Sequence, residues 1–255
     1  MTETPPSAPR PSAPCSGDDA VALLAEHREL TGVDFSGQDL RAALRGPTSP
    51  YTFTKCTFTE ANLRRALLPE AVFTDCVLDR ADLGGALLEQ ARFQGGSAAF
   101  AKGTDADLTD ATFSGTDLAN STWAGALLAG TRFEDCRMVG VRLKGCRGIG
   151  YTLARCHLGL AQLSGLDFRG RLLERNNFTE ADLSGCDFSE AVLDGCRLAE
   201  AELRGARFAG ADLRGADLGA PGPEDLVALR GAFVSVTQAT ALLAALGLHV
   251  LPPEG

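Results

Sequence analysis

Apolar residues recur at every fifth position along most of the chain. From Phe53 to Leu218 this step visits 34 positions, and 31 of them hold Leu, Phe, Trp or Met. The exceptions are Ala98, Gly103 and Gly148. Two residues before each of these centres lies a second selected position, where 24 of 34 residues are Ala or Cys. The register does not slip between residues 51 and 220.

A period of five matches neither the 3.6-residue turn of an α-helix nor the two-residue repeat of a strand. It predicts a short extended segment followed by a turn, repeated many times. Alternate residues of an extended segment point the same way, so the centre and the small residue before it both face inward. The other three positions carry Asp, Arg, Ser, Thr, Glu and Gly and face water.

The phenylalanines indicate how many pentapeptides form one coil. They fall into two series with a spacing of 20 residues, which are Phe53, Phe73, Phe93, Phe113, Phe133 and Phe168, Phe188, Phe208. Four pentapeptides per coil give a four-sided solenoid in which residues 20 apart stack at about 4.8 Å. Residues 51–220 then form 8.5 coils, a rod about 40 Å long.

The repeat resembles the motif of the pentapeptide-repeat family, Ala-(Asp/Asn)-Leu-x-x. Intact copies begin at Ala61, Ala81, Ala106, Ala181, Ala211 and Ala216. The resemblance covers about two thirds of the chain. It implies an all-β solenoid, a right-handed quadrilateral β-helix, with short helical caps at the N- and C-terminal ends. The handedness comes from the family alone.

Residues 1–50 are expected to hold a tail and the first cap. The Pro- and Ser-rich segment 1–15 predicts a disordered tail, and residues 16–50 the N-terminal cap. In this cap a helix is expected over 18–30, with Val21, Leu24 and Leu30 covering the first coil. The segments 33–35 and 38–40 look like early repeats, and a loop over 43–50 restores the register.

Residues 221–255 predict the C-terminal cap, which also serves as a dimerisation segment. Pro221-Gly222-Pro223 interrupts the repeat, and Leu229 and Val234 resume it. A helix is expected from Thr237, as N-cap, to Leu246, with Gly247 as its C-terminal αL residue. A short strand is expected over 248–251. The helix is apolar nearly all round, so part of it needs another partner. The candidate dimer interface is Leu242, Leu243, Leu246, Leu248 and Val250.

Two short matches at this end, Gly231-Ala232-Phe233-Val234 and Leu246-Gly247-Leu248, are similar to the quinolone-resistance branch of the family. That likeness implies a homodimer joined through the C-terminal helix and strand. It also implies a rod that mimics B-form DNA, binds DNA gyrase or topoisomerase IV, and protects the enzyme from inhibitors. Such a protein confers antibiotic resistance, quinolone resistance included, or self-resistance on its host.

The formal net charge is −9, which disfavours nucleic acid as a ligand. No run of apolar residues is long enough to span a membrane, and the N-terminus has no secretory signal pattern, so we expect a cytoplasmic protein.

Charge varies along the repeat. Residues 132–175 carry four acids and nine bases, between sections of net charge −4 (51–131) and −5 (176–220). The candidate acidic, partner-binding patch is Glu180, Asp182, Asp187, Glu190, Glu200 and Glu202. An ordinary soluble surface is the alternative interpretation of this section.

The side chains give no sign of catalysis. Seven of the eight cysteines occupy the small inward position, where they replace Ala as compact hydrophobes, and stacked side chains suit disulfides poorly. No metal-ligand spacing or phosphate-binding glycine motif occurs. We therefore expect no catalytic residues, no metal and no cofactor.

The basic middle section does not suit a uniform mimic of DNA. It contains Arg137, Arg142, Lys144 and Arg147, and either meets an acidic surface of the partner or favours the alternative function, a protein-interaction scaffold with an unrelated partner. The repeat is also irregular here, because Tyr151, Leu166 and Arg171 hold small inward positions. A buried, unpaired Arg171 would be costly, so the backbone is expected to distort into a local bend, with a functional notch as the alternative interpretation.

Overall fold

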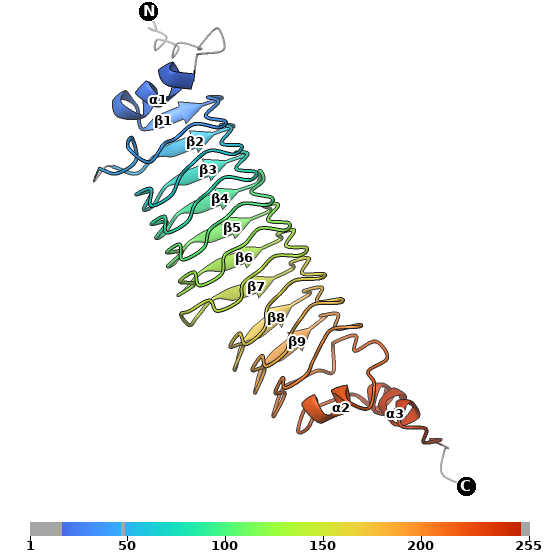
Figure 1. The fold of residues 1–255 in the computed structure, drawn as a ribbon. Helices are drawn as coiled ribbons and strands as arrows, with labels where there is room; N and C mark the ends of the chain where they lie inside the picture. The colour runs from blue at the N-terminus through green and yellow to red at the C-terminus, as the bar shows by residue number, and fades with distance from the viewer. Residues whose placement is uncertain (1–16, 47–48, 251–255) are drawn as a thin grey trace, which may run out of the picture.

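The computed structural model describes residues 17–46 and 49–250, which form a long, four-sided solenoid with short helices at both ends (Figure 1). One face, called the first face, carries nine parallel three-residue strands in the order β1 to β9. Their bounds are β1 Glu29–Thr31, β2 Thr52–Thr54, β3 Val72–Thr74, β4 Arg92–Gln94, β5 Thr112–Ser114, β6 Arg132–Glu134, β7 Thr152–Ala154, β8 Leu172–Glu174 and β9 Val192–Asp194.

The other three faces consist of single parallel bridges between residues 20 apart, such as Thr57↔Val77, Asn62↔Asp82 and Leu67↔Leu87. We number these faces second, third and fourth in chain order. The predicted four-sided all-β solenoid is thus confirmed. Along most of the described rod each coil pairs with the next on all four sides, because the pentapeptide centres donate their amides to the coil that follows, as Phe58 does to Val77 at 2.6 Å.

The corner after each pentapeptide is made by a residue in the left-handed conformation. Glu60, Arg65 and Glu70 have φ of 59°, 55° and 56°, and Gly takes this position in many other repeats. On the second face the amide of Ala61 donates to the Phe58 carbonyl at 3.0 Å and closes the turn. A side chain in this conformation is disfavoured by about 1 kcal/mol, so cooperative stacking must offset a cost repeated at many corners.

The core is one continuous interior, in which Leu, Phe and Ala side chains stack in parallel columns of residues 20 apart. On the first face the rings of Phe73, Phe93 and Phe113 stack with centroids 4.7 and 4.5 Å apart. A second stack on the fourth face contains Phe188 and Phe208 at 4.7 Å. Offset-stacked rings add about 0.5–1.5 kcal/mol per pair beyond their buried area, which explains why phenylalanine repeats within a column.

One vacant centre is explained by its neighbour. A Cβ atom at Gly103 would lie 2.1 Å from Cε3 of Trp123, the residue one coil later in the same column. Trp123 is fully buried, and its Nε1 donates to the Ser121 hydroxyl at 3.0 Å. Gly103 therefore makes room for the one tryptophan.

The N-terminal cap is shorter than predicted. Helix α1 spans Gly17–Glu26 rather than 18–30, and Leu30 lies in strand β1, paired with Phe53. Leu24 and Leu30 are both buried on the first coil as expected, and Val21 is half-buried. The Tyr51 hydroxyl donates to the Leu24 carbonyl at 2.8 Å and ties α1 to the rod. The early repeats are confirmed by the bridges Asp34↔Thr57 and Asp39↔Asn62. The predicted tail, residues 1–15, lies outside the described residues.

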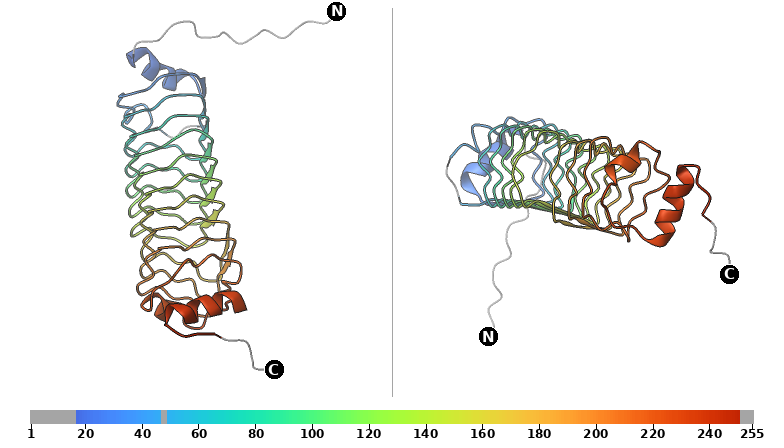
Figure 2. Two further views of the ribbon diagram at one scale, coloured as in Figure 1. Left: turned by 90° about the vertical axis from the view of Figure 1, so that its right-hand side faces the viewer. Right: turned by 90° about the horizontal axis from the view of Figure 1, so that it is seen from below.

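The C-terminal cap contains two helices, α2 at Asp225–Ala228 and α3 at Val236–Ala245 (Figure 2). The N-cap of α3 is Ser235 and not Thr237 as predicted, because Ser235 and Gln238 form a capping box. Gly247 has the expected positive φ of 77°. The predicted strand over 248–251 is wrong for residues 248–250, which form no strand, and residue 251 is not described.

Gln238 joins α3 to the rod. Its Nε2 donates to the carbonyls of Leu213 and Ala216, both at 2.7 Å. These carbonyls belong to the last coil, on which the short segment 231–233 stacks through the bridge Asp212↔Phe233. The Gln238 side chain adds hydrogen bonds at an edge that no complete coil covers among the described residues. Within the described ranges, no helix is long and apolar enough to cross a membrane.

Candidate partner-binding surfaces

The six predicted acidic residues do not form one cluster. Asp182 and Glu202 are bridge partners on the third face. Glu180 and Glu200 occupy the adjoining corner one coil apart, where the Glu180 amide donates to the Ala199 carbonyl. Like charges directly opposite each other destabilise a sheet, so these two stacked carboxylate pairs are not explained by stability. Arg204 pairs with Glu202 at 3.0 Å and offsets part of the charge.

The remaining two predicted residues lie elsewhere. Asp187 is on the fourth face, paired with Arg207 at 2.8 Å and Arg169 at 3.8 Å, and its side chain is 13% exposed. Burial raises the pKa of Asp187, but hydrogen bonds from Ser189 and Arg207 outweigh burial and hold the pKa below its usual value. The Asp187 carboxylate is therefore already engaged in ion pairs within the rod. Glu190 is exposed at the following corner.

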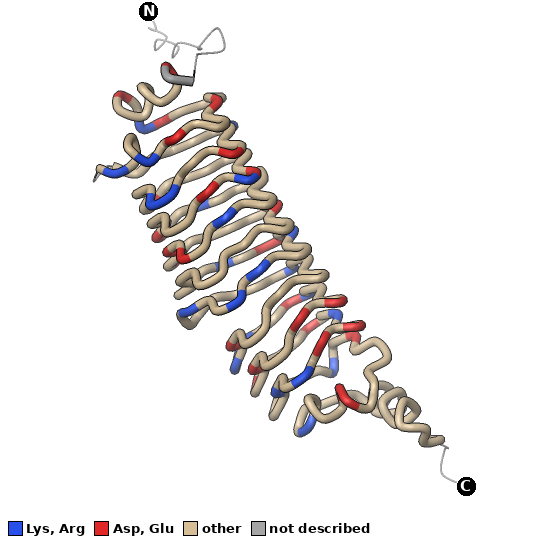
Figure 3. The backbone as a smooth tube through the Cα atoms, viewed as in Figure 1, with Lys and Arg blue, Asp and Glu red and all other residues tan. Residues whose placement is uncertain are grey.

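Seen from one side, acidic and basic segments alternate along much of the rod (Figure 3). We call the four carboxylates of Glu180, Asp182, Glu200 and Glu202 the acidic corner. Because charges of both signs alternate elsewhere on the rod, the acidic corner is a local feature of the last coils.

The predicted dimer residues are mostly exposed on the C-terminal cap. Leu243 is 38% exposed and Leu246 51%, and Leu248 and Val250 are similarly open. Leu242 is half-buried and packs against the core of its own rod. Helix α3 contains no fully buried residue. An apolar helix held at the rod end mainly by Gln238 and Leu242 leaves an unpartnered apolar face.

The basic middle section contains more cations than its acids can pair. Arg155 pairs with Asp135 at 2.8 Å and Glu174 at 3.2 Å, and it also faces Glu134 at 3.8 Å. Asp167 pairs with Arg169 at 2.6 Å. Within this described section, the cations that form no ion pair include Arg142, Lys144, Arg147 and Arg171.

The coils separate in this section, as the expected distortion required. On the fourth face the bridge Leu127↔Arg147 is not followed by one between Arg147 and Asp167, and pairing resumes at Asp167↔Asp187. Strand β7 pairs with β8 through Ala154↔Glu174 alone, and the two strands are offset in Figure 1. Arg171 is half-buried, outside the core.

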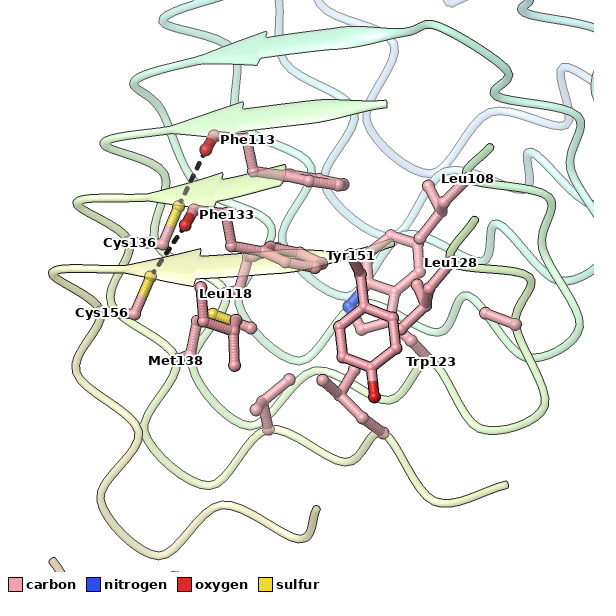
Figure 4. Close-up of a cluster of buried hydrophobic side chains, with 14 of the residues drawn as sticks. Leu108, Phe113, Leu118, Trp123, Leu128, Phe133, Cys136, Met138, Tyr151 and Cys156 are labelled. Carbon is pink, nitrogen blue, oxygen red and sulfur yellow. Dashed lines mark hydrogen bonds between the residues drawn. The ribbon is translucent and has the colours of Figure 1, made fainter. Parts of the chain in front are cut away.

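Five of the inward cysteines share one column, in which each thiol donates a hydrogen bond as well as filling space. They are Cys56, Cys76, Cys136, Cys156 and Cys196. Cys136 donates to the Phe113 carbonyl and Cys156 to the Phe133 carbonyl, both at 3.4 Å (Figure 4). These thiols are buried, and across the described residues no group of His, Cys, Asp and Glu could hold a metal ion.

Sequence models of pentapeptide repeats match most of the rod. The model for pentapeptide repeats matches residues 106–145, 156–195 and 181–219, and that for a pentapeptide repeat region matches residues 51–123. No curated protein matches the chain.

Solved structures share the fold. Full-length QnrB1, a plasmid-mediated fluoroquinolone resistance protein, aligns with a TM-score of 0.59 and 21% identity over 86% of this chain and 97% of its own. A trypsin-treated form of QnrB1 aligns at 0.57 with 22% identity, covering 88% and 97%. HetL, a pentapeptide repeat protein involved in heterocyst differentiation regulation in the cyanobacterium Nostoc, is 26% identical, with a TM-score of 0.43 and coverage of 74% and 86%. At these identities the likeness to QnrB1 concerns the fold.

Proposed function

The chain belongs to the pentapeptide repeat family, and we propose that it binds DNA gyrase or topoisomerase IV as a mimic of DNA and protects that enzyme from an inhibitor. In this proposal the chain is a binding protein and catalyses no reaction. Its rod occupies the groove that normally holds the DNA duplex.

The acidic corner is the observation that carries the proposal. Its two carboxylate pairs repeat at the coil spacing of about 4.8 Å, and they face solvent on a rigid support. A row of fixed negative charges on a rod attracts a basic groove shaped for the DNA backbone. The cost of stacking like charges on one column favours a binding role over a structural one.

The C-terminal cap extends this surface in the proposal. If two copies join through the exposed side of α3, their last coils lie toward the centre of the dimer. The two acidic corners then flank one central region. Such a dimer would present a longer charged rod than either copy alone. A longer rod could follow more of the length of a groove that holds a DNA duplex.

The test is a DNA supercoiling assay with purified gyrase, with and without a quinolone. The wild-type protein is expected to bind gyrase and to preserve supercoiling at inhibitor concentrations that otherwise abolish it. The variant E180Q/D182N/E200Q/E202Q should need about tenfold more protein for the same protection, because it loses four charges that steer association.

A matched control removes four exposed carboxylates from corners far from the cap, in E70Q/D75N/D105N/D110N. It should protect like the wild type. Equal loss in both variants would assign the effect to total charge, and absence of binding by the wild type at micromolar concentration would exclude the proposal.

The second candidate function is a scaffold for an unrelated protein. The unpaired cations Arg142, Lys144 and Arg147 favour it, because a uniform mimic of DNA has no use for a basic section. Recovery of a different partner from the native host, together with no binding to either topoisomerase, would support the scaffold.

A further inference from the structure

The backbone ladder opens along one continuous stretch of the rod. It runs from Gly145 to Leu153 on one coil, opposite residues 165–173 of the next. In regular coils Gly165 donates its amide to the Ser184 carbonyl and Gly170 to that of Ser189, both at 2.9 Å. Within the described chain, the equivalent amides of Gly145 and Gly150 have no such bond. The ladders on the second and third faces of the same coils stay paired.

Tyr151 holds the two sides apart. Its hydroxyl donates to the Asp167 carbonyl at 2.7 Å and accepts from the Asp167 amide at 2.8 Å. In a regular ladder that carbonyl would accept from Gly148, as the Asp187 carbonyl accepts from Phe168. Tyr151 thus supplies hydrogen-bond partners for the Asp167 amide and carbonyl on one side of the opening. On the other side, the Gly148 amide has no hydrogen-bond partner among the described residues.

A groove of about 440 Å³ lies at this opening. Ile149, Arg169, Gly170 and Arg171 line it, together with Asp167 and Glu190. Ile149 is 75% exposed, and nearby Leu172 is 62% exposed. Outward positions on this rod are mainly polar, so two open aliphatic side chains beside free backbone amides are unusual.

The charged side chains around the opening carry a net positive charge. Each carboxylate of residues 132–175 already faces an arginine, whereas Arg142, Lys144, Arg147 and Arg171 are unpaired among the described residues. Glu190 is the unpaired carboxylate at the groove border. The excess of cations therefore fits an anionic occupant.

We propose that this opening, which we call the coil junction, is a docking site for an extended, acidic segment of the partner protein. Free amides on an opened ladder match the backbone of an added strand. Alternate side chains of that strand would place carboxylates against the cations and apolar groups against Ile149 and Leu172. The proposal rests on the proposed function, since the segment is assigned to the topoisomerase.

A nucleic acid fits the site less well than a peptide does. The acidic corner and the other carboxylates of residues 176–220 follow directly along the rod and would repel a phosphate backbone. A short peptide can occupy the junction without extending over them.

The test compares charge reversals in the full-length protein. K144E/R147E changes two exposed cations at the junction. The control R92E/K102E changes one Arg and one Lys two coils away, which are also exposed and form no ion pair with another described residue. The affinity of K144E/R147E for gyrase should be about tenfold lower than that of the wild type at low salt. The difference should shrink at high salt, because salt screens the charges. The affinity of the control should stay close to that of the wild type. The exposed substitution I149D should also weaken binding without altering thermal unfolding.

Hydrogen exchange separates the two proposals. Added gyrase should slow exchange of the amides at 145–150. If wild-type protein binds gyrase but these amides stay unprotected and K144E/R147E binds normally, the docking site is overturned and the proposed function stands.

If gyrase does not bind at all, the proposed function fails, and a synthetic peptide of alternating Glu and Val decides the docking site. Protection of 145–150 by this peptide, lost in K144E/R147E, supports a strand-addition site for an acidic segment. No protection by the peptide, or protection by duplex DNA instead, overturns it.

Discussion

At the residue scale, the cysteines follow the geometry of one corner. On the second, third and fourth faces the centre carbonyl accepts the amide three residues later, as Leu163 does from Leu166 at 3.2 Å. The described first-face centres from Phe53 to Leu193 lack this turn bond, whereas Leu213 in the last coil accepts it from Ala216 at 2.9 Å. Most of their carbonyls instead accept a side chain from the next coil.

The donors to these carbonyls share one column of small inward positions. They are Cys56, Cys76, Thr116, Cys136, Cys156, Asn176 and Cys196. Gly96 and Ala216 in that column supply no donor, and a Cβ at Gly96 would lie 2.1 Å from the Cys76 carbonyl oxygen. The column therefore selects a hydrogen-bond donor, where neighbouring columns select Ala.

Removing one of these donors should cost more than removing a similar thiol elsewhere. Cys196 donates to the Leu173 carbonyl at 3.2 Å, on the first face. We expect C196A to lower the free energy of unfolding by about 1–2 kcal/mol, and C196S by less because it keeps a donor. Urea unfolding at neutral pH under reducing conditions measures both.

The control is C186A. Cys186 donates to the Leu163 carbonyl at 3.2 Å, but that carbonyl already accepts the turn bond from Leu166, and Ala is the usual residue in this column. We expect a smaller loss than for C196A. Equal losses for C196S and C196A would show that volume, and not hydrogen bonding, selects cysteine.

The inward placement of the cysteines could be predicted from the period of five, and the choice of cysteine could not. The period is identical at every corner, whereas the missing turn bond depends on the backbone of the first face. Similarly, Tyr151 and Arg171 could be recognised as irregular, but the bond from Tyr151 to Asp167 depends on the separation of two coils, which the period does not encode.

At the element scale, the repeats were predictable and the caps only partly so. Every coil meets the same environment, so one pattern specifies all of them. Each cap is a single solution to one open end. The prediction extended the first helix through Leu30 because that residue is apolar at helical spacing, but strand β1 uses it to begin the sheet. Helix α2, with four residues, was too short to give a periodic pattern.

The apolar face of α3 leads to a prediction about association. We expect the wild-type protein to be a dimer and L243D/L246D to be a monomer, because two buried carboxylates would face each other across the interface. Light scattering coupled to size exclusion measures the mass. The control L160D places the same charge on an exposed leucine of the rod, 57% open, and should remain a dimer.

Circular dichroism must confirm that L243D/L246D keeps the rod, which is expected because both side chains are exposed. A dimeric double variant, or a monomeric wild type, would contradict association through α3.

At the scale of the whole molecule, the surfaces depend on how the coils stack. A register of 20 residues could be predicted to bring Asp182 over Glu202, and this is confirmed by their bridge. The register could not show that Asp187 is separate from the acidic corner, because the arginines that form ion pairs with Asp187 come from neighbouring coils. The coil junction likewise arises between coils, where the period alone carries no information.

Three inward thiols, the half-buried Cys146 and the buried Cys186 and Cys196, make the whole rod sensitive to alkali. Burial raises the pKa of Cys146 and Cys186 to about 12 and that of Cys196 to about 11, from an ordinary value of 9.0. The folded-state pKa lies above the unfolded one, so the unfolded chain ionises first as pH rises. Stability is therefore fully present below about pH 9 and is lost as pH rises toward 11–12.

We expect the urea midpoint to be constant between pH 7 and 8.5 and to fall steeply by pH 10, at about 1 kcal/mol for each such thiol. C146A/C186A should flatten this fall, because it removes two groups that only the unfolded chain can ionise, at positions where Ala fits the column. A reducing agent in every sample excludes disulfide formation as the cause. If the urea midpoint of the double variant falls with pH as steeply as that of the wild type, groups other than Cys146 and Cys186 cause the loss of stability in alkali. Burial of these two thiols would then not explain the pH dependence.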